Sequence, residues 1–247
     1  MKKIILFALL TFTTMGFAQQ NMKKQVSKKD VKNGLITFET FTNNAGDVSY
    51  GFRMGALIVG PNMIKHSDGK VTYQNYNKEH TIDGTVIIMD NQKQKIELYT
   101  YRDSKKEGPS FVITNGKPTA TDEYKNDKID LGGHKVKPPG KYVLIKGDGK
   151  SGFTMEKDDK GYAIGYFKYG YRQFPMIHVW NSGNSYYGQY LGGQRLGFGV
   201  FFFNDSTKYV GMFDEGYLEG LGFMVDKDGT ITEKGYYDNG KLLYAID

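Results

Sequence analysis

The sequence contains no cysteine and few histidines among its 247 residues. Without cysteine there is no disulfide framework, no thiolate metal site and no cysteine that could accept a lipid after an export signal. Packing and hydrogen bonds therefore have to stabilise the fold. The histidines, which show no i,i+2 or i,i+4 ligand spacing, are His66, His80, His134 and His178. We therefore expect no metal and no cofactor.

Long apolar runs are also missing, with one exception at the N-terminus. Two lysines precede the apolar stretch 4–10, and residues 16–18 offer small side chains for cleavage before Gln19. This pattern is typical of a secretory signal peptide, and its threonines leave it short of the ~20 residues of a membrane span. We expect residues 1–18 to be removed and the protein to be exported, to the periplasm or the cell exterior.

An excess of one charge sign is confined to a short segment. The chain carries 33 basic and 27 acidic residues, a net charge of +6. The signal peptide takes two lysines with it, and residues 19–33 hold the remaining excess. This segment has one acidic residue, Asp30, and five basic residues: Lys23, Lys24, Lys28, Lys29 and Lys32. We predict a basic, flexible arm, with contact to an anionic membrane surface as the alternative; an exported protein rarely meets nucleic acid.

Glycine and aromatic residues are abundant, with 32 Gly, 19 Tyr and 16 Phe. The segments 186–199 and 209–222 superpose at a period of 23 residues without a gap. The matched residues are Tyr186, Gly188, Tyr190, Gly193, Gly197 and Gly199 in the first, and Tyr209, Gly211, Phe213, Gly216, Gly220 and Gly222 in the second. A partial copy follows, with Gly235, Tyr237 and Gly240.

This pattern resembles the MORN repeat, Tyr-x-Gly-x-aromatic-x-x-Gly-x-x-x-Gly-x-Gly. The match is close over residues 156–247, and residues 34–155 form divergent copies. Each unit carries two turn signals rich in Gly, Asn and Asp, hence two strands. We predict an all-β fold: an elongated, single-layer antiparallel β-meander or solenoid of repeated hairpins, about nine units long.

Alternation along a strand explains why the same residue types recur. Tyr186, Gly188 and Tyr190 share one face of their strand, and Gly197 and Gly199 share one face of the next. Glycine weakens a strand, so its repeated use indicates close packing of rings on backbone. We expect the glycines to leave room for rings of neighbouring strands.

No motif predicts catalysis. Residues 147–152 match GxGxxG, but a strand and a turn follow where a dinucleotide site needs a helix. Residues 226–229 open like a calcium loop that no further carboxylate completes. No serine lies in a GxSxG elbow, and residues 19–45 are too few for a catalytic domain. We therefore predict that the protein is not an enzyme.

The resemblance implies a scaffold or dimerisation platform, and a lipid-binding role is proposed for such repeats. We predict a protein-interaction or envelope scaffold whose partner is a protein. The alternatives are a lipid or membrane-surface protein and a glycan-binding module. For these alternatives we predict a binding surface that combines rings on the second face of the layer with the lysines of the arm. These residues are Tyr187, Phe198, Lys23, Lys24, Lys28 and Lys29.

Overall fold

The structure, a computed structural model, describes residues 24–129, 152–157, 159–168 and 171–247. Regular structure there is almost entirely β-strand, with one short helix, α2 (Lys28–Lys32). The strands form two nine-stranded antiparallel sheets, in which each strand pairs with the next one in the chain. The prediction of an all-β fold of successive hairpins is confirmed.

The first sheet consists of β1 (Ile36–Thr42), β2 (Val48–Met54), β3 (Leu57–Lys65), β4 (Val71–Tyr76), β5 (Gly84–Asp90), β6 (Lys95–Arg102), β7 (Lys105–Thr114), β8 (Lys117–Lys125) and β9 (Lys128–Ile129). The second sheet consists of β10 (Gly152–Lys157), β11 (Gly161–Lys168), β12 (Tyr171–Trp180), β13 (Ser185–Leu191), β14 (Gln194–Phe202), β15 (Lys208–Asp214), β16 (Tyr217–Val225), β17 (Ile231–Asp238) and β18 (Lys241–Ala245).

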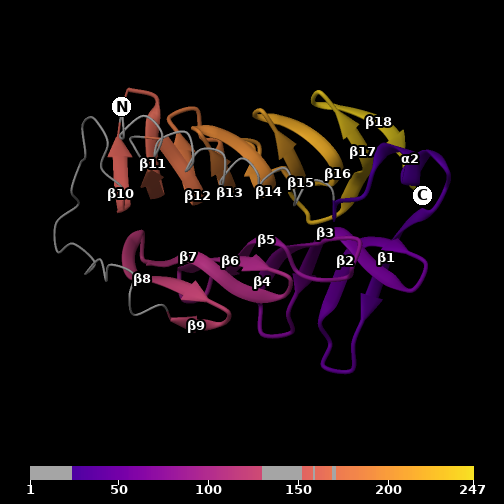
Figure 1. Cartoon of the computed structure of the whole chain (residues 1–247), viewed down its shortest axis with the longest axis horizontal. Helices are drawn as coiled ribbons and strands as arrows, with labels where there is room; N and C mark the ends of the chain where they lie inside the picture. The colour runs from indigo at the N-terminus through magenta and orange to yellow at the C-terminus, as the bar shows by residue number, and fades with distance from the viewer. Residues whose placement is uncertain (1–23, 130–151, 158, 169–170) are drawn as a thin grey trace, which may run out of the picture.

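The prediction of a single layer is wrong, because the two sheets pack face to face (Figure 1). The second sheet runs back over the first: β15 and β16 lie against β3, and β12 lies against β6 and β7. Both sheets contribute to one core, with Phe52 and Leu98 from the first and Phe198 and Val210 from the second, all fully buried. Burial of this apolar surface, at ~25 cal/mol per Å², holds the layers together.

The period of two along a strand divides the side chains between the two faces of the second sheet. On β14, Phe198 and Val200 belong to the core between the sheets. Phe201, on the other face, packs against an outer cluster that includes Tyr186 and Tyr209. The second sheet is therefore apolar on both faces.

The outer face of the first sheet is different in kind, because polar side chains take the place of the glycines. In register, Gly51 pairs with Asn62, and Asn62 pairs with Gln74. The Asn62 amide donates to the Ser49 hydroxyl at 2.9 Å and to the Tyr50 carbonyl at 3.1 Å. Hydrogen bonds of the Asn62 side chain thus lie on the outer face of the first sheet, where the second sheet has ring-on-glycine packing.

A bulge glycine brings the two sheets close together. Gly60 on β3 has φ +68°, and a Cβ added to it would lie 2.7 Å from Cδ1 of Leu221 in the other sheet. Only glycine combines that backbone angle with so little space. The bulge therefore sets the local separation of the layers.

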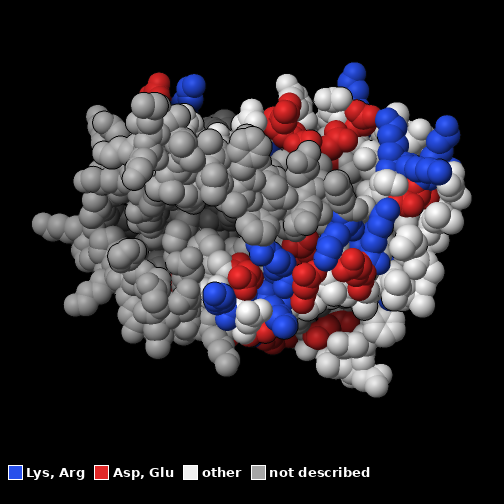
Figure 2. All heavy atoms as spheres, viewed as in Figure 1, with Lys and Arg blue, Asp and Glu red and all other residues white. Residues whose placement is uncertain are grey.

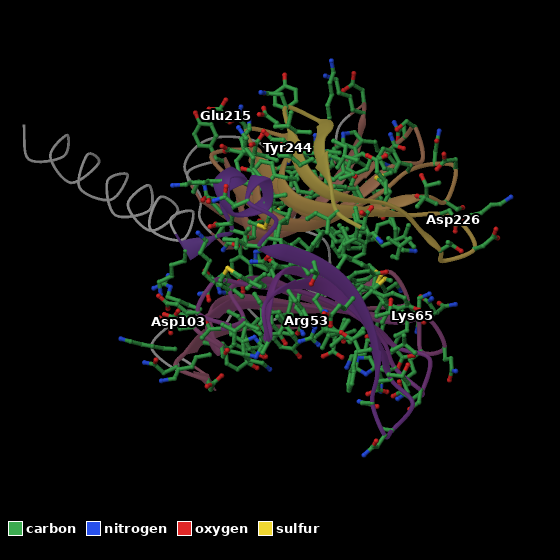
Figure 3. All side chains as sticks on the ribbon, turned by 90° about the vertical axis from the view of Figure 1, so that its right-hand side faces the viewer. Arg53, Lys65, Asp103, Glu215, Asp226 and Tyr244 are labelled. Carbon is green, nitrogen blue, oxygen red and sulfur yellow. The ribbon has the colours of Figure 1, made fainter. Side chains whose placement is uncertain are left out.

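The hairpin turns gather along two long edges of the sandwich (Figure 3). Asp103 and Glu215 lie on one edge, one from each sheet, and Lys65 and Asp226 lie on the other. Across the latter edge, the Lys65 ammonium donates to the Gly229 carbonyl at 3.1 Å. We call the edge of Asp103 and Glu215 the arm edge, because the N-terminal segment packs there.

Candidate functional site

The repeat tyrosines pack on the glycines as predicted. A Cβ added to Gly199 would lie 2.5 Å from Cε2 of Tyr186, and one added to Gly222 would lie 2.5 Å from Cε2 of Tyr209. Real Cβ atoms do not come so close to another atom, so these positions accept only glycine unless the ring moves. The glycines form a row across the strands, in which Gly188, Gly199, Gly211, Gly222 and Gly235 pair in succession.

The tyrosine hydroxyls fix the rings in place. The Tyr186 hydroxyl donates to the Gln189 carbonyl at 3.0 Å, and the Tyr209 hydroxyl donates to the Met212 carbonyl at 3.2 Å. In the partial third copy, the Tyr237 hydroxyl bonds to the Glu233 carboxylate instead. Complete burial raises the pKa of Tyr186 and of Tyr209 well above its ordinary value. These groups stay neutral and serve packing.

The turn glycines join one hairpin to the next. The backbone amides of Gly193, Gly216 and Gly240 each donate to a carbonyl in the preceding hairpin, at 3.2, 3.0 and 2.9 Å. Their φ angles are positive, as tight turns require. Gly197 and Gly220 also have positive φ, +75° and +77°. The remaining motif rings, Tyr190, Phe213 and Tyr237, lie in the outer cluster with Tyr186 and Tyr209.

An aromatic shelf lies on the outer face of the second sheet, made of His178, Trp180, Phe201 and Phe203. The His178 and Trp180 ring centroids are 3.9 Å apart, Trp180 and Phe201 5.6 Å, and Phe201 and Phe203 4.8 Å. His178 is buried and bonds to the Tyr190 hydroxyl at 2.9 Å, which fixes its ring. The other three are half-buried, and no third layer covers them within the described ranges.

The predicted binding rings are not on this face. Phe198 has no exposed surface, and the mostly buried Tyr187 packs against the same core between the sheets. Their assignment to an open face is wrong, because the first sheet covers the face to which they point. The shelf was not predicted from sequence, although the alternation along β14 and on to Phe203 places Phe201 and Phe203 on the face opposite Phe198.

The basic arm is packed onto the body in its described part, so the prediction of a flexible arm is wrong for residues 24–33. Val26 and Val31 are buried in the core between the sheets. Ser27 caps α2: its side chain accepts from the Asp30 amide, and the Asp30 carboxylate accepts from the Ser27 amide. Such a capping box stabilises a helix start.

The arm lysines are partly neutralised by this docking. The Lys24 ammonium lies 3.1 Å from both Glu79 and Asp103, and the Lys28 ammonium lies 2.6 Å from Asp238. Lys29 is exposed, and Lys23 lies outside the described residues. On the face shown in Figure 2, basic and acidic side chains of the described residues lie next to one another. The arm therefore offers less free positive charge than the sequence indicates.

A cleft of about 350 Å³ lies between the arm and the sandwich on the arm edge. Residues 25–28 of the arm form one wall of this cleft, and its apolar lining includes Met212 and Leu221. Two carboxylates, Asp214 and Glu219, also line it. We call it the arm cleft. Its size is that of a small-molecule site.

The lysines that line the arm cleft have ion-pair partners, whereas in the described part of the structure the carboxylates that line it do not. Its two lysines, Lys28 and Lys78, pair with Asp238 and Asp30, each at 2.6 Å. The hydrogen bond from Lys78, with that of Ser27, lowers the pKa of Asp30 to about 2. Lys28 likewise lowers the pKa of Asp238.

The carboxylates that line the arm cleft lack such partners. Glu219 accepts one hydrogen bond, from the Asn239 amide at 3.0 Å. Within the described part of the chain, neither Asp214 nor Glu219 has an ion pair. The negative charges of Asp214 and Glu219 therefore face the arm cleft without an ion-pair partner among the described residues.

The segment 226–229, which opens like a calcium loop, forms a turn. The Asp226 carboxylate accepts from the Asp228 and Thr230 amides, both at 2.9 Å, which accounts for the calcium-like segment. Among the residues described, no three His, Asp or Glu side chains gather as a metal site would need. The GxGxxG match and His134 fall outside the described residues, apart from Gly152 at the start of β10. No helix in the described ranges has the length and apolarity to cross a membrane.

Comparison with known proteins gives no family for this chain. No protein-family model matches it, and a search of curated proteins finds no match either.

Proposed function

We propose that this protein is a non-enzymatic exported scaffold that binds a protein partner through the aromatic shelf. The observation that supports this is the half-buried state of Trp180, Phe201 and Phe203 on a face without a covering layer in the described chain. Clustered rings on a rigid sheet provide contact area at low entropic cost, and aromatic residues are enriched where proteins bind one another.

We also propose that the hairpins are MORN-type repeats, about nine in number, folded back on themselves. The support is that Tyr186 and Tyr209, 23 residues apart, make the same contacts. Each ring lies against a glycine of its own strand and a glycine of the next strand. Each hydroxyl donates to the carbonyl three residues ahead.

The binding proposal is tested by capture from the cell envelope. Mature wild-type protein and the Trp180→Ala variant are used as baits, and retained proteins are identified by mass spectrometry. A partner retained by the wild type and lost with the variant is expected. Tyr171→Ala is the matched control, because Tyr171 is an exposed ring of the same strand, 60% accessible, outside the shelf.

The purified partner then gives a direct measurement. Trp180 is the only tryptophan of the chain, so its fluorescence reports on the shelf alone. Binding should reduce quenching of Trp180 by acrylamide. If the partner binds but leaves quenching unchanged, or binds both variants equally, the shelf is not its site.

Export is proposed on the signal-like segment 1–18. Expression of the whole chain should yield a protein in the periplasm or medium whose measured mass is that of residues 19–247. An Ala18→Arg substitution should leave the precursor uncleaved. A cytoplasmic protein that retains Met1 would refute export.

A further inference from the structure

We propose that the arm cleft binds an alkylammonium group, meaning a positively charged amine on an apolar stem. This site is separate from the aromatic shelf, since it lies between the arm and the sandwich at the arm edge rather than on the outer face of the second sheet. The proposal therefore stands or falls independently of the scaffold function.

The charge of the arm cleft selects a cation. Lys28 and Lys78 are each held 2.6 Å from carboxylates of Asp238 and Asp30, which are not among the residues that line the cleft. Asp214 and Glu219 have no ion pair among the described residues. The four charged side chains that line the arm cleft sum to zero, but both lysines are engaged in these ion pairs, which leaves the carboxylates of Asp214 and Glu219 as the unpaired charges of the lining. An anion would meet Asp214 and Glu219 without a free lysine to receive it.

The field of Glu219 extends to a neighbouring group. Tyr236 lines the arm cleft, and its pKa is raised first by burial and next by the charge of Glu219. Both groups line the same space. The negative charge of Glu219 disfavours the Tyr236 phenolate and would attract an ammonium bound there.

The apolar lining selects the stem. Val26 from the arm and Met212 and Leu221 from the second sheet are each at most 8% exposed, and all three line the arm cleft. A fully hydrated metal ion or a bare ammonium would gain nothing from these walls, whereas an alkyl chain would bury apolar surface against them. The combination of carboxylates and apolar walls fits an amine with an aliphatic chain.

The arm itself completes the arm cleft. Residues 25–28 form one wall, and ion pairs of Lys24 with Glu79 and Asp103 fasten that segment to the first sheet. The Gln25 side chain also accepts from the Asn75 amide at 3.1 Å. The arm cleft therefore exists only while the arm is docked.

The test is titration of the mature protein with pentylammonium chloride, followed by NMR and calorimetry at low salt. We expect saturable binding with a dissociation constant of about 1 mM. Pentanol and pentanoate, of the same length without the positive charge, should not saturate. Binding should weaken as salt rises, because the site is partly exposed to solvent.

The variants identify the site. Asp214→Asn with Glu219→Gln should weaken pentylammonium binding by about tenfold or more, a loss of ~1.4 kcal/mol. Glu215→Gln is the matched control, because Glu215 is an exposed carboxylate at the tip of the same hairpin (Figure 3) and does not line the arm cleft. Both substitutions in the cleft preserve shape, and each single variant is measured if the double variant unfolds.

Two results would overturn the proposal: no saturable binding of pentylammonium, or equal binding by the wild type and the Asp214/Glu219 variants. A parallel titration with a glycine-flanked lysine tripeptide distinguishes the sources of the amine. At least tenfold tighter binding of the tripeptide assigns the site to a lysine side chain of a protein. Binding no tighter than that of pentylammonium assigns it to a free amine.

Discussion

The ring of Tyr209 fills the space above Gly222 on the neighbouring strand, where a Cβ would lie 2.5 Å from its Cε2 atom. The relation explains why the motif keeps tyrosine and glycine together at fixed spacing. The ring needs a position without a side chain on the adjacent strand, and its hydroxyl needs the Met212 carbonyl, to which it donates at 3.2 Å.

Replacement of Gly222 by alanine should therefore destabilise the protein by about 3 kcal/mol, because the added methyl group forces the buried Tyr209 ring to move. The measurement is urea unfolding of the mature protein, followed by circular dichroism. Gly222 needs no positive φ, so the whole cost is steric.

Two variants test that cause. Gly192→Ala, at a turn glycine with open space around it and φ +59°, should cost only ~1 kcal/mol. In a Tyr209→Ala background, Gly222→Ala should cost much less than in the wild type, because contacting residues are energetically coupled. Additive costs of Tyr209→Ala and Gly222→Ala would show that the ring and the glycine do not compete for space.

The hairpin order and the ring-on-glycine contacts of this fold could be predicted from sequence, because both are local. The turn residues determine the hairpins, and the 23-residue period aligns Tyr186 with Tyr209. The second layer was missed although a sign of it was present. On β14, Phe198 and Val200 alternate with Gly199 and Phe201, so both faces are apolar, and an apolar face needs a covering layer.

The arm cleft could not be predicted from sequence for a different reason. Its lining comes from the arm, from β3, from Lys78 after β4 and from β15 to β17, which are brought together only when the second sheet folds back. Neither turn signals nor repeat spacing determine that reversal. The docked arm gave a weak signal: Ser27 and Asp30 have the spacing of a capping box, and Val26 and Val31 flank it.

Phe198 should behave as a core residue. Its replacement by alanine removes a fully buried ring from between the sheets, at an expected cost of about 3–5 kcal/mol. Phe41→Ala is the matched control, because Phe41 is 56% exposed on the edge strand β1, and it should change stability by about 0.5 kcal/mol or less. If Phe198→Ala and Phe41→Ala both had small and equal effects on urea unfolding, Phe198 would have to lie on an open surface and not in the core.

Removal of apolar side chains from the arm should also lower stability. Val26→Ala and Val31→Ala should each lower the free energy of unfolding by about 1–3 kcal/mol, since both side chains are in the core. Lys32→Ala, at an exposed position of α2, should have little effect. Thermal unfolding gives the comparison, and a free arm would leave the midpoints of all three variants at the wild-type value.

Asp83 should make the protein less stable at neutral pH than in mild acid. Burial, with a smaller contribution from the charge of Asp103, raises the pKa of Asp83 to about 6. Because this folded-state pKa lies above the ordinary value near 4, the folded chain holds the proton more tightly than the unfolded chain does. The contribution of Asp83 to stability therefore falls as pH rises from about 4 to about 6, and stays low above that.

Replacement of Asp83 by asparagine removes the charge and should raise the free energy of unfolding at pH 7.5 by up to ~3 kcal/mol. At pH 3.5, where Asp83 is mostly protonated in both states, the gain should nearly vanish. Asp228→Asn, in an exposed turn, controls for the loss of one carboxylate and should show no such dependence. Urea unfolding at the two pH values decides the matter: a variant less stable than the wild type at pH 7.5 would mean that contacts of the Asp83 carboxylate outweigh the cost of burying its charge.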